Sequence, residues 1–176
     1  ENDETADEIT DPESETAALE LETAAETVSD SSAAMEKYQT QVFAMDTVMI
    51  LTAYGEHAEE SLAAAENLLH AIESDLDPES TTGSVYALNH SSGEEVSVSD
   101  DCYQVYLTTM DYWRASGGAL DPGMYSLSKA WGFINGNYRV PSPEEISDLL
   151  TAKKTEDIRL NTSVPSISVP DGTEIS

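Results

Sequence analysis

The feature that most constrains this chain is Gly117-Gly118-Ala119-Leu120-Asp121-Pro122, which ends one predicted helix and delays the next. Glycine adopts backbone conformations that strain other residues, and helices commonly end at such a residue. Proline disfavours helical backbone in the residue before it, so Asp121 is expected to be extended. The segment therefore predicts either a structural turn or a loop whose backbone can approach a ligand closely.

Hydrophobic periodicity divides the neighbouring sequence into a strand and two helices. Residues 41–54 alternate with apolar residues on both faces, which predicts one central β-strand. Residues 57–76 carry apolar residues at helical spacing, and we expect this helix to pack on the sheet. Residues 100–116 have an aromatic and apolar stripe and predict a second helix, capped by Ser99 or Asp100.

Shorter signals complete the expected fold. Ser142-Pro143-Glu144-Glu145 combines a capping serine, a proline at the first helical position and a glutamate three residues after the cap. A helix is therefore expected from here through Ala152. Residues 85–89 fit a helix or a strand equally well, and short strands are expected at 95–98, 157–161, 166–169 and 173–176. This mixture predicts an α+β domain with a mixed sheet and packed helices.

The amino-terminal residues differ from the rest in charge. Residues 1–34 hold 12 of the 35 Asp and Glu residues and contain no Lys, Arg or aromatic residue. Such a segment buries too little apolar surface to offset the entropy lost on folding. The sequence therefore predicts a disordered acidic tether over residues 1–37, followed by one folded region over residues 38–176.

Charge and cysteine content exclude several kinds of site. The net charge of −28 argues against nucleic acid or an anionic membrane surface as a partner, because phosphates are bound by clustered Lys and Arg. Cys102 is the only cysteine, so the sequence has neither an internal disulfide nor a site with several thiolate ligands. We expect Cys102 to pack as a small hydrophobic residue.

Three motifs in order resemble the ApbE family of FAD:protein FMN transferases. The double-glycine motif, followed after eight residues by Trp131-Gly132-Phe133, is similar to the family signature. Ala44-Met45-Asp46-Thr47-Val48-Met49 resembles the opening strand of the family, and Gly83-Ser84-Val85-Tyr86-Ala87-Leu88-Asn89 resembles its Ser-Glu-Ile-x-x-Leu-Asn segment. The resemblance covers about residues 38–176 and implies an incomplete, ApbE-like and T-fold-like layered domain, roughly the first half of a transferase.

The resemblance implies a specific reaction. FMN is transferred from FAD to a threonine hydroxyl of a target protein, such as a subunit of a flavin-dependent redox complex, and AMP is released. Mg²⁺ is the implied cofactor, and a domain this acidic needs such positive charge beside phosphates. An extracytoplasmic lipoprotein is also implied, anchored to the membrane through a lipid on a cysteine before Glu1. The catalytic base and metal ligands are expected after Ser176.

Four residues fall on positions that line the FAD site in the family: Met45, Ala119, Leu120 and Asp121. The Asp121 carboxylate is expected to accept a hydrogen bond from the adenine amino group or a ribose hydroxyl, with backbone and apolar contacts from its two predecessors. Alternatively, Asp121 only forms the turn. The family's flavin-contacting Asp would fall at Ser176, and the loop 77–84 cannot be aligned.

A hypothesis from another class stays open. The chain could be a non-enzymatic, secreted acidic domain that has the family scaffold and binds a partner without chemistry. Many family members have Gly-Pro where this chain has Tyr125-Ser126, so the backbone path after Asp121 is expected to differ from theirs. The codons that follow Ser176 would distinguish this hypothesis from a transferase.

Overall fold

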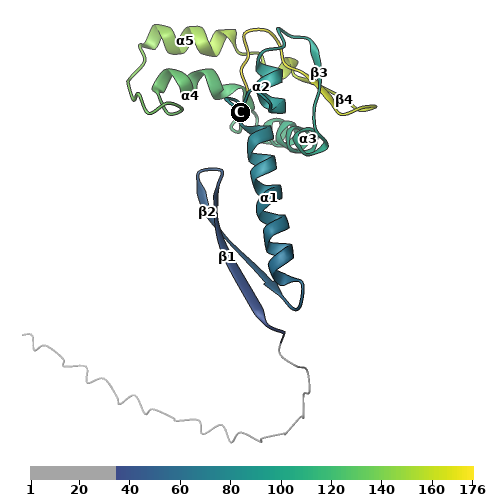
Figure 1. Ribbon diagram of the computed structural model, residues 1–176. Helices are drawn as coiled ribbons and strands as arrows, with labels where there is room; N and C mark the ends of the chain where they lie inside the picture. The colour runs from purple at the N-terminus through teal and green to yellow at the C-terminus, as the bar shows by residue number, and fades with distance from the viewer. Residues whose placement is uncertain (1–34) are drawn as a thin grey trace, which may run out of the picture. The chain divides into compact units, whose positions relative to one another are not determined.

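The computed structural model describes residues 35–176, which form one compact unit with helices and two small antiparallel sheets (Figure 1). The prediction of a disordered tether falls almost entirely on residues 1–34, outside the described residues. The predicted α+β class is confirmed. In chain order the elements are β1 (Lys37–Ala44), β2 (Thr47–Tyr54), α1 (Ala58–Leu76), α2 (Ser84–Asn89), β3 (Glu95–Ser97), α3 (Asp100–Ala115), η1 (Pro122–Met124), α4 (Tyr125–Trp131), α5 (Pro143–Ala152), η2 (Thr155–Asp157), β4 (Arg159–Asn161) and β5 (Ser166–Ser168).

Residues 41–54 do not form one central strand, so that prediction was wrong. β1 and β2 pair antiparallel as a hairpin, and Met45 and Asp46 form its two-residue turn with φ angles of 52° and 54°. Such turns favour Asn and Gly, so Met-Asp gives no local signal of one. The Glu73 carboxylate of α1 accepts a hydrogen bond of 2.6 Å from the Met45 N–H, a long-range contact that stabilises the turn.

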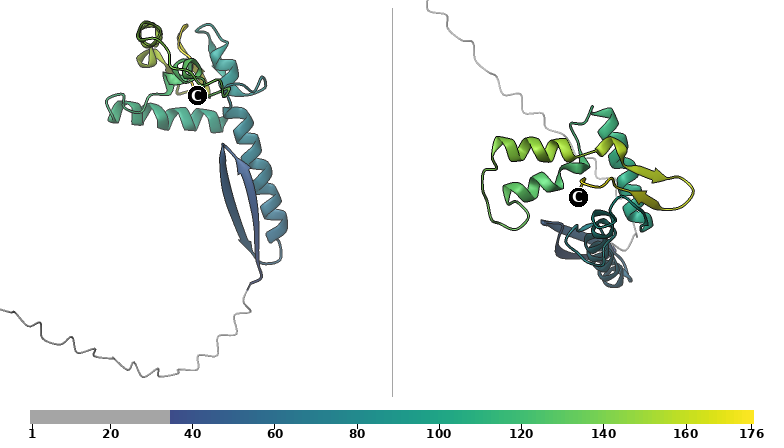
Figure 2. Two further views of the ribbon diagram at one scale, coloured as in Figure 1. Left: turned by 90° about the vertical axis from the view of Figure 1, so that its left-hand side faces the viewer. Right: turned by 90° about the horizontal axis from the view of Figure 1, so that it is seen from above.

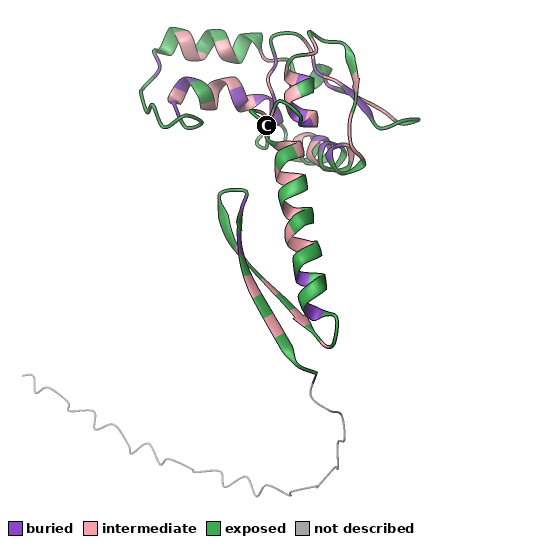
Figure 3. Ribbon diagram, viewed as in Figure 1, coloured by how far each residue is buried: buried purple, intermediate pink, exposed green. Residues whose placement is uncertain are grey.

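The hairpin covers only one of the two apolar faces in the alternating pattern. One face of the hairpin lies along α1 (Figures 1 and 2). Val42 and Ala44 of β1 are buried. On the other face, Phe43, Val48 and Ile50 are exposed. Figure 3 shows this alternation as buried and exposed colours along the strands. The pattern therefore reflects a two-stranded sheet with one covered face.

The predicted helices are confirmed with small shifts in their ends. Ser99 caps α3, because its Oγ accepts a hydrogen bond of 3.0 Å from the Cys102 N–H. Ser142 caps α5 in the same way, accepting from the Glu145 N–H at 3.1 Å. The undecided segment 85–89 is helical, as α2. No helix within residues 35–176 combines the length and the apolar content of a membrane span.

The core lies where α2 and α3 meet the three-stranded sheet β3–β5–β4. Cys102 is fully buried there, and burial raises the pKa of its thiol to about 12, with the Asp75 carboxylate as a second cause. The thiol is therefore neutral and packs as a small hydrophobic residue. The buried core residues are Val85, Leu88, Cys102, Tyr106, Met110, Ile158, Ile167, Val169 and Ile175.

Residues 173–176 do not form the predicted strand. Thr173 and Ile175 are buried and alternate with less buried neighbours, as in a strand, but the segment pairs with neither sheet of the described residues. The Ile175 backbone is paired by the side chain of Asn89 instead. A period-two pattern indicates extended backbone, and it does not say whether the backbone partner is a strand or a side chain.

Candidate functional site

The double glycine ends α3 as the sequence predicts. Gly117 and Gly118 have φ angles of 64° and 86°, and the Gly118 N–H donates to the Trp113 carbonyl at 2.9 Å. Asp121 is extended, with φ of −138°, before Pro122 begins the short helix η1. The motif therefore ends α3, connects it to α4 and places its Asp121 side chain at the start of η1.

The Asp121 carboxylate is hydrogen-bonded within the protein. Its Oδ1 accepts from the Gly123 N–H at 2.9 Å and from Thr155 Oγ1 at 2.7 Å, and its Oδ2 pairs with the Lys153 ammonium. Burial opposes its ionisation, but these three donors outweigh burial and hold the pKa of Asp121 below its usual range. Asp121 thus joins the motif to the chain after α5.

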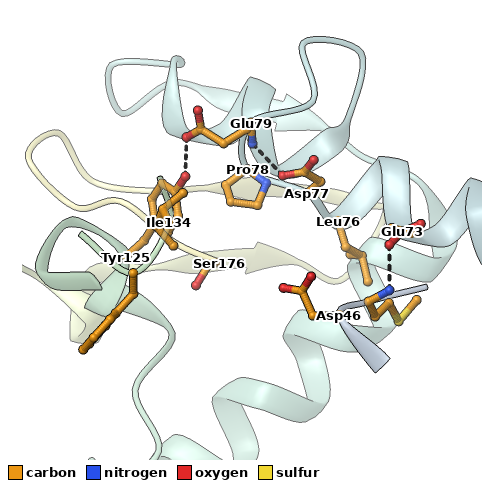
Figure 4. Close-up of a pocket in the computed structure, with 11 residues that line it drawn as sticks. Asp46, Glu73, Leu76, Asp77, Pro78, Glu79, Tyr125, Ile134 and Ser176 are labelled. Carbon is orange, nitrogen blue, oxygen red and sulfur yellow. Dashed lines mark hydrogen bonds between the residues drawn. The ribbon is translucent and has the colours of Figure 1, made fainter. Parts of the chain in front are cut away.

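A cavity of about 580 Å³ lies beside the β1–β2 turn, and its size is within the usual range for small-molecule sites, roughly 300–1,000 Å³ (Figure 4). Its walls come from the turn, the end of α1 with the loop after it, the start of α4 and the loop after α4. The lining residues are Met45, Asp46, Glu73, Leu76, Asp77, Pro78, Glu79, Tyr125, Phe133, Ile134 and Ser176.

The structure brings some of the sequence-predicted site residues together and leaves others apart. Met45 lines the cavity, and so do Ser176 and the beginning of the 77–84 loop. Ala119 and Leu120 are exposed and Asp121 is partly buried. None of these three residues lines the cavity. The cavity is therefore lined by Met45 of the opening motif, by Ser176 and by the beginning of the 77–84 loop. The resemblance pointed to the last two without assigning either of them a contact with FAD.

The lining is divided between apolar surface and carboxylates. Leu76, Pro78 and Ile134 offer apolar surface with the aromatic residues, whereas Asp46, Glu73, Asp77 and Glu79 supply negative charge. Within residues 35–176, no Lys, Arg or His lines the cavity. The hydrogen bond from the Met45 N–H and contacts from His70 lower the pKa of Glu73, which favours its ionised form. The cavity suits an apolar planar ring and disfavours an uncompensated anion.

Tyr125 links α4 to the loop after α1. Its ring is buried, and its hydroxyl donates a hydrogen bond to the Glu79 carboxylate (Figure 4). Burial, followed by the neighbouring Glu79 carboxylate, raises the pKa of Tyr125 above its usual range. The phenol is therefore neutral at physiological pH and acts as a donor that orients Glu79 at the cavity.

Asn89 and Pro122 position Ser176 at the cavity. The Asn89 side-chain amide donates to the Ile175 carbonyl at 2.9 Å and accepts from the Ile175 N–H at 2.8 Å, so it replaces a strand partner. The Ser176 N–H then donates to the Pro122 carbonyl at 3.4 Å. Asn89 and Pro122, each from one of the sequence motifs, thus act on the cavity indirectly, by fixing the backbone of a residue that reaches it.

Tyr125-Ser126, the departure from the family pattern, has a structural role in the same segment. Ser126 Oγ and the Lys129 ammonium each lie 2.5 Å from a different oxygen of the Glu174 carboxylate. Burial disfavours the ionised form, but Lys129 and Ser126 outweigh it and lower the pKa of Glu174. These contacts anchor the chain immediately before Ser176.

The lining residues described here do not fit the pyrophosphate of FAD or a metal ion. Among the residues that the structure describes, none with a cationic side chain lines the cavity, and Lys129 and Lys153 already pair with Glu174 and Asp121. In residues 35–176, no three His, Cys, Asp or Glu side chains converge in a way that could hold a metal ion. Mg²⁺ is thus not supported by these residues.

Sequence reasoning missed several lining residues. Glu79 lies in the 77–84 loop, which cannot be aligned with the family, and Ile134 follows the Trp-Gly-Phe motif without belonging to it. Phe133 belongs to the Trp-Gly-Phe motif, so its aromatic ring beside a glycine was a usable signal. Tyr125 had one signal too, because it stands where many members of the ApbE family have glycine.

Comparisons with known proteins give a family model and several similar structures. The model described as the ApbE family matches residues 45–175. Among solved structures, the ApbE protein of Thermotoga maritima has a TM-score of 0.71 at 23% identity, with 80% of this chain and 47% of that chain covered. The apo flavinyl transferase ApbE of Pseudomonas stutzeri has a TM-score of 0.69 at 17% identity, with 81% and 50% covered.

A third similar structure is the flavin transferase ApbE of Vibrio cholerae, with a TM-score of 0.70 at 18% identity and 81% and 48% of the two chains covered. The chain therefore spans about half the length of these structures. At these identities the likeness shows the fold alone. No curated protein matches the chain in a sequence search.

Proposed function

Because the chain belongs to the ApbE family, we propose that it is the flavin-binding half of a transferase that moves FMN from FAD to a threonine hydroxyl. One observation carries the proposal: all three motifs that resemble the family contribute to one cavity. Met45 lines it directly, while Asn89 and Pro122 fix the chain at Ser176, which also lines it. Shared fold alone would not support a function, whereas convergence of motifs on a site does.

The proposed reaction breaks one phosphoanhydride bond and forms one phosphoester bond. The threonine oxygen bonds to the phosphorus of the FMN moiety, the bond from that phosphorus to the bridging oxygen breaks, and AMP leaves with the bridging oxygen. The hydroxyl proton passes to a base. Such a transfer needs alignment, a base and positive charge near the phosphates.

The residues of this chain account for binding and alignment of the flavin. Leu76, Pro78 and Ile134 give the ring an apolar surface, and the neutral Tyr125 hydroxyl holds the Glu79 carboxylate in place. The lining carboxylates repel the pyrophosphate, so the phosphates are directed out of the cavity. We therefore assign the base, the positive charge and any Mg²⁺ ligands to residues outside 35–176.

The wider setting follows from the family and is part of the same proposal. The acceptor is a subunit of a flavin-dependent redox complex, and the protein faces outward as a membrane-anchored lipoprotein. No described residue bears on the anchor. A fractionation experiment on the producing cell, with release of the protein by a lipase or a detergent, tests this location.

We expect the 176-residue chain alone to transfer no FMN, and the intact transferase that contains it to do so. The measurement is the mass of a threonine-containing acceptor protein after incubation with FAD and MgCl₂, with AMP measured in parallel. An acceptor whose threonine is replaced by valine is the control. Transfer by the chain alone would show that the catalytic groups are misassigned. Inactivity of the intact protein would favour the non-enzymatic binding domain.

A further inference from the structure

The cavity beside the β1–β2 turn is lined by charge of one sign. Four carboxylates reach it from three segments, namely the turn, the end of α1 and the loop after α1 (Figure 4). They belong to Asp46, Glu73, Asp77 and Glu79. Within residues 35–176, no cationic side chain lines the cavity. These carboxylates therefore impose a negative potential on whatever occupies it.

Glu79 is oriented by a neutral partner. The buried Tyr125 hydroxyl donates a hydrogen bond to the Glu79 carboxylate, and burial keeps that phenol neutral by raising its pKa. The Glu79 N–H donates to Asp77 Oδ1 at 2.9 Å, which fixes the backbone of the same loop. The Glu73 carboxylate, by contrast, lies 3.2 Å from His70 Nδ1, a partner that becomes a cation when protonated. Tyr125 thus positions Glu79 without supplying a positive charge to offset it.

A flavin ring changes its charge when it is reduced. The oxidised ring is neutral at physiological pH, whereas the two-electron reduced ring loses its N1 proton near neutrality and becomes an anion. The phosphate groups of FMN or FAD are the same in both states, so only the ring differs in charge. A negative protein charge near the ring therefore opposes binding of the reduced state more than binding of the oxidised state.

We propose that the cavity selects oxidised over reduced flavin and that Glu79 is a specificity-determining residue. This inference rests on the proposed function, which places the flavin ring in the cavity. The carboxylates that repel the pyrophosphate also repel the anionic ring, and this repulsion distinguishes two states of one substrate. The transferase then takes oxidised FAD, and the acceptor receives FMN in its oxidised state.

Solvent exposure limits the size of this selectivity. Asp46, Asp77 and Glu79 are exposed and Glu73 is partly buried, so water and salt screen their charges. One such carboxylate is expected to change the ratio of the two affinities by about three-fold at low ionic strength, and the set by about ten-fold. Concentrated salt should weaken both effects, which separates a charge effect from a preference for the flat shape of the oxidised ring.

The test measures the affinities of oxidised and dithionite-reduced FMN for the intact transferase by anaerobic calorimetry. The pH is mildly alkaline, where the reduced ring is an anion, and Mg²⁺ is left out. Glu79→Gln removes the charge but keeps an oxygen that can accept from Tyr125. Asp77→Asn is a second variant at the cavity. Glu94→Gln is the matched control, because Glu94 is exposed and does not line the cavity.

The wild type and Glu94→Gln should bind oxidised FMN roughly ten-fold more tightly than reduced FMN at low ionic strength. In Glu79→Gln and in Asp77→Asn this preference should fall to about three-fold, mainly because the reduced form binds more tightly. High salt should lower the preference of the wild type in the same direction.

Equal affinity of the wild type for the two forms, or the same preference in Glu79→Gln as in the wild type, would overturn the inference. Tighter binding of reduced FMN would overturn it too, and would indicate that a carboxylate accepts a hydrogen bond from the N5–H of the reduced ring. In each of these cases oxidised FMN still binds, so the proposed function stands. If neither form binds, the proposed flavin cavity is wrong, and the inference fails with it.

Discussion

Asp121→Ala is expected to lower the free energy of unfolding by roughly 2–4 kcal/mol, because it leaves a largely buried ammonium and two further donors without their acceptor. The Lys153 and Asp121 side chains are 20% and 11% exposed, so water replaces little of the lost pairing. Denaturant unfolding of the ligand-free protein measures the effect. Asp148→Ala is the control, since it removes an exposed carboxylate from α5.

The pH dependence of this difference is a second signature of the same contact. The pKa of Asp121 is lower in the folded chain than in the unfolded one. Its contribution to stability is therefore complete above the unfolded pKa of about 3.9 and is lost as the pH falls through the folded value. The difference in the free energy of unfolding between the wild type and Asp121→Ala should therefore narrow as the pH falls below about 3.9. An equally stable variant with weaker FAD binding would instead support a ligand contact.

Gly132→Ala is expected to destabilise the protein by roughly 2–4 kcal/mol, because strain in the backbone adds to a steric clash. The φ of Gly132 is 80°, and a Cβ there would lie 2.0 Å from the Asn137 carbonyl oxygen. The carbonyl belongs to the backbone of the same loop, so relief requires the loop to open. A melting curve measures the loss.

Gly136→Ala separates the two causes. Gly136 has φ of 71°, but a Cβ there would have no atom within 4 Å. Its substitution should cost only the backbone strain, about 1–2 kcal/mol. Equal losses for both variants would show that the close approach at Gly132 is not what fixes the loop.

Local sequence signals predicted α1, α3 and α5 because their caps and stripes are local, whereas α4 was not predicted. Ser99 and Ser142 cap helices within three residues of the groups they bind, and the glycine pair ends α3 through its own backbone freedom. The hairpin turn at Met45 could not be predicted in this way. It depends on Glu73, which lies 28 residues further along the chain.

The site was predictable only in part, because several contacts that build it join residues far apart in the sequence. Met45 was named from a motif, but Glu79 and Tyr125 meet across 46 residues of sequence, and no local pattern encodes their contact. The motif that contains Asn89 was recognised from the sequence, but its structural role was not. The Asn89 side chain hydrogen-bonds the backbone of Ile175. The prediction that Ala119, Leu120 and Asp121 contact FAD stays a prediction, and these residues lie outside the cavity lining.

The most direct test of the flavin-binding cavity is a titration of the isotope-labelled 176-residue chain with FAD, followed by amide NMR. Chemical shifts report weak binding residue by residue, so even a low affinity of this chain for FAD is measurable. FMN and AMP, titrated separately, distinguish the flavin from the adenine end. We expect FAD and FMN to shift the amides of Met45, Asp46, Glu79, Ile134 and Ser176, with α5 and β4 unaffected. Shifts confined to residues 119–121, or the same cavity shifts with AMP as with FMN, would contradict a cavity that binds the flavin ring.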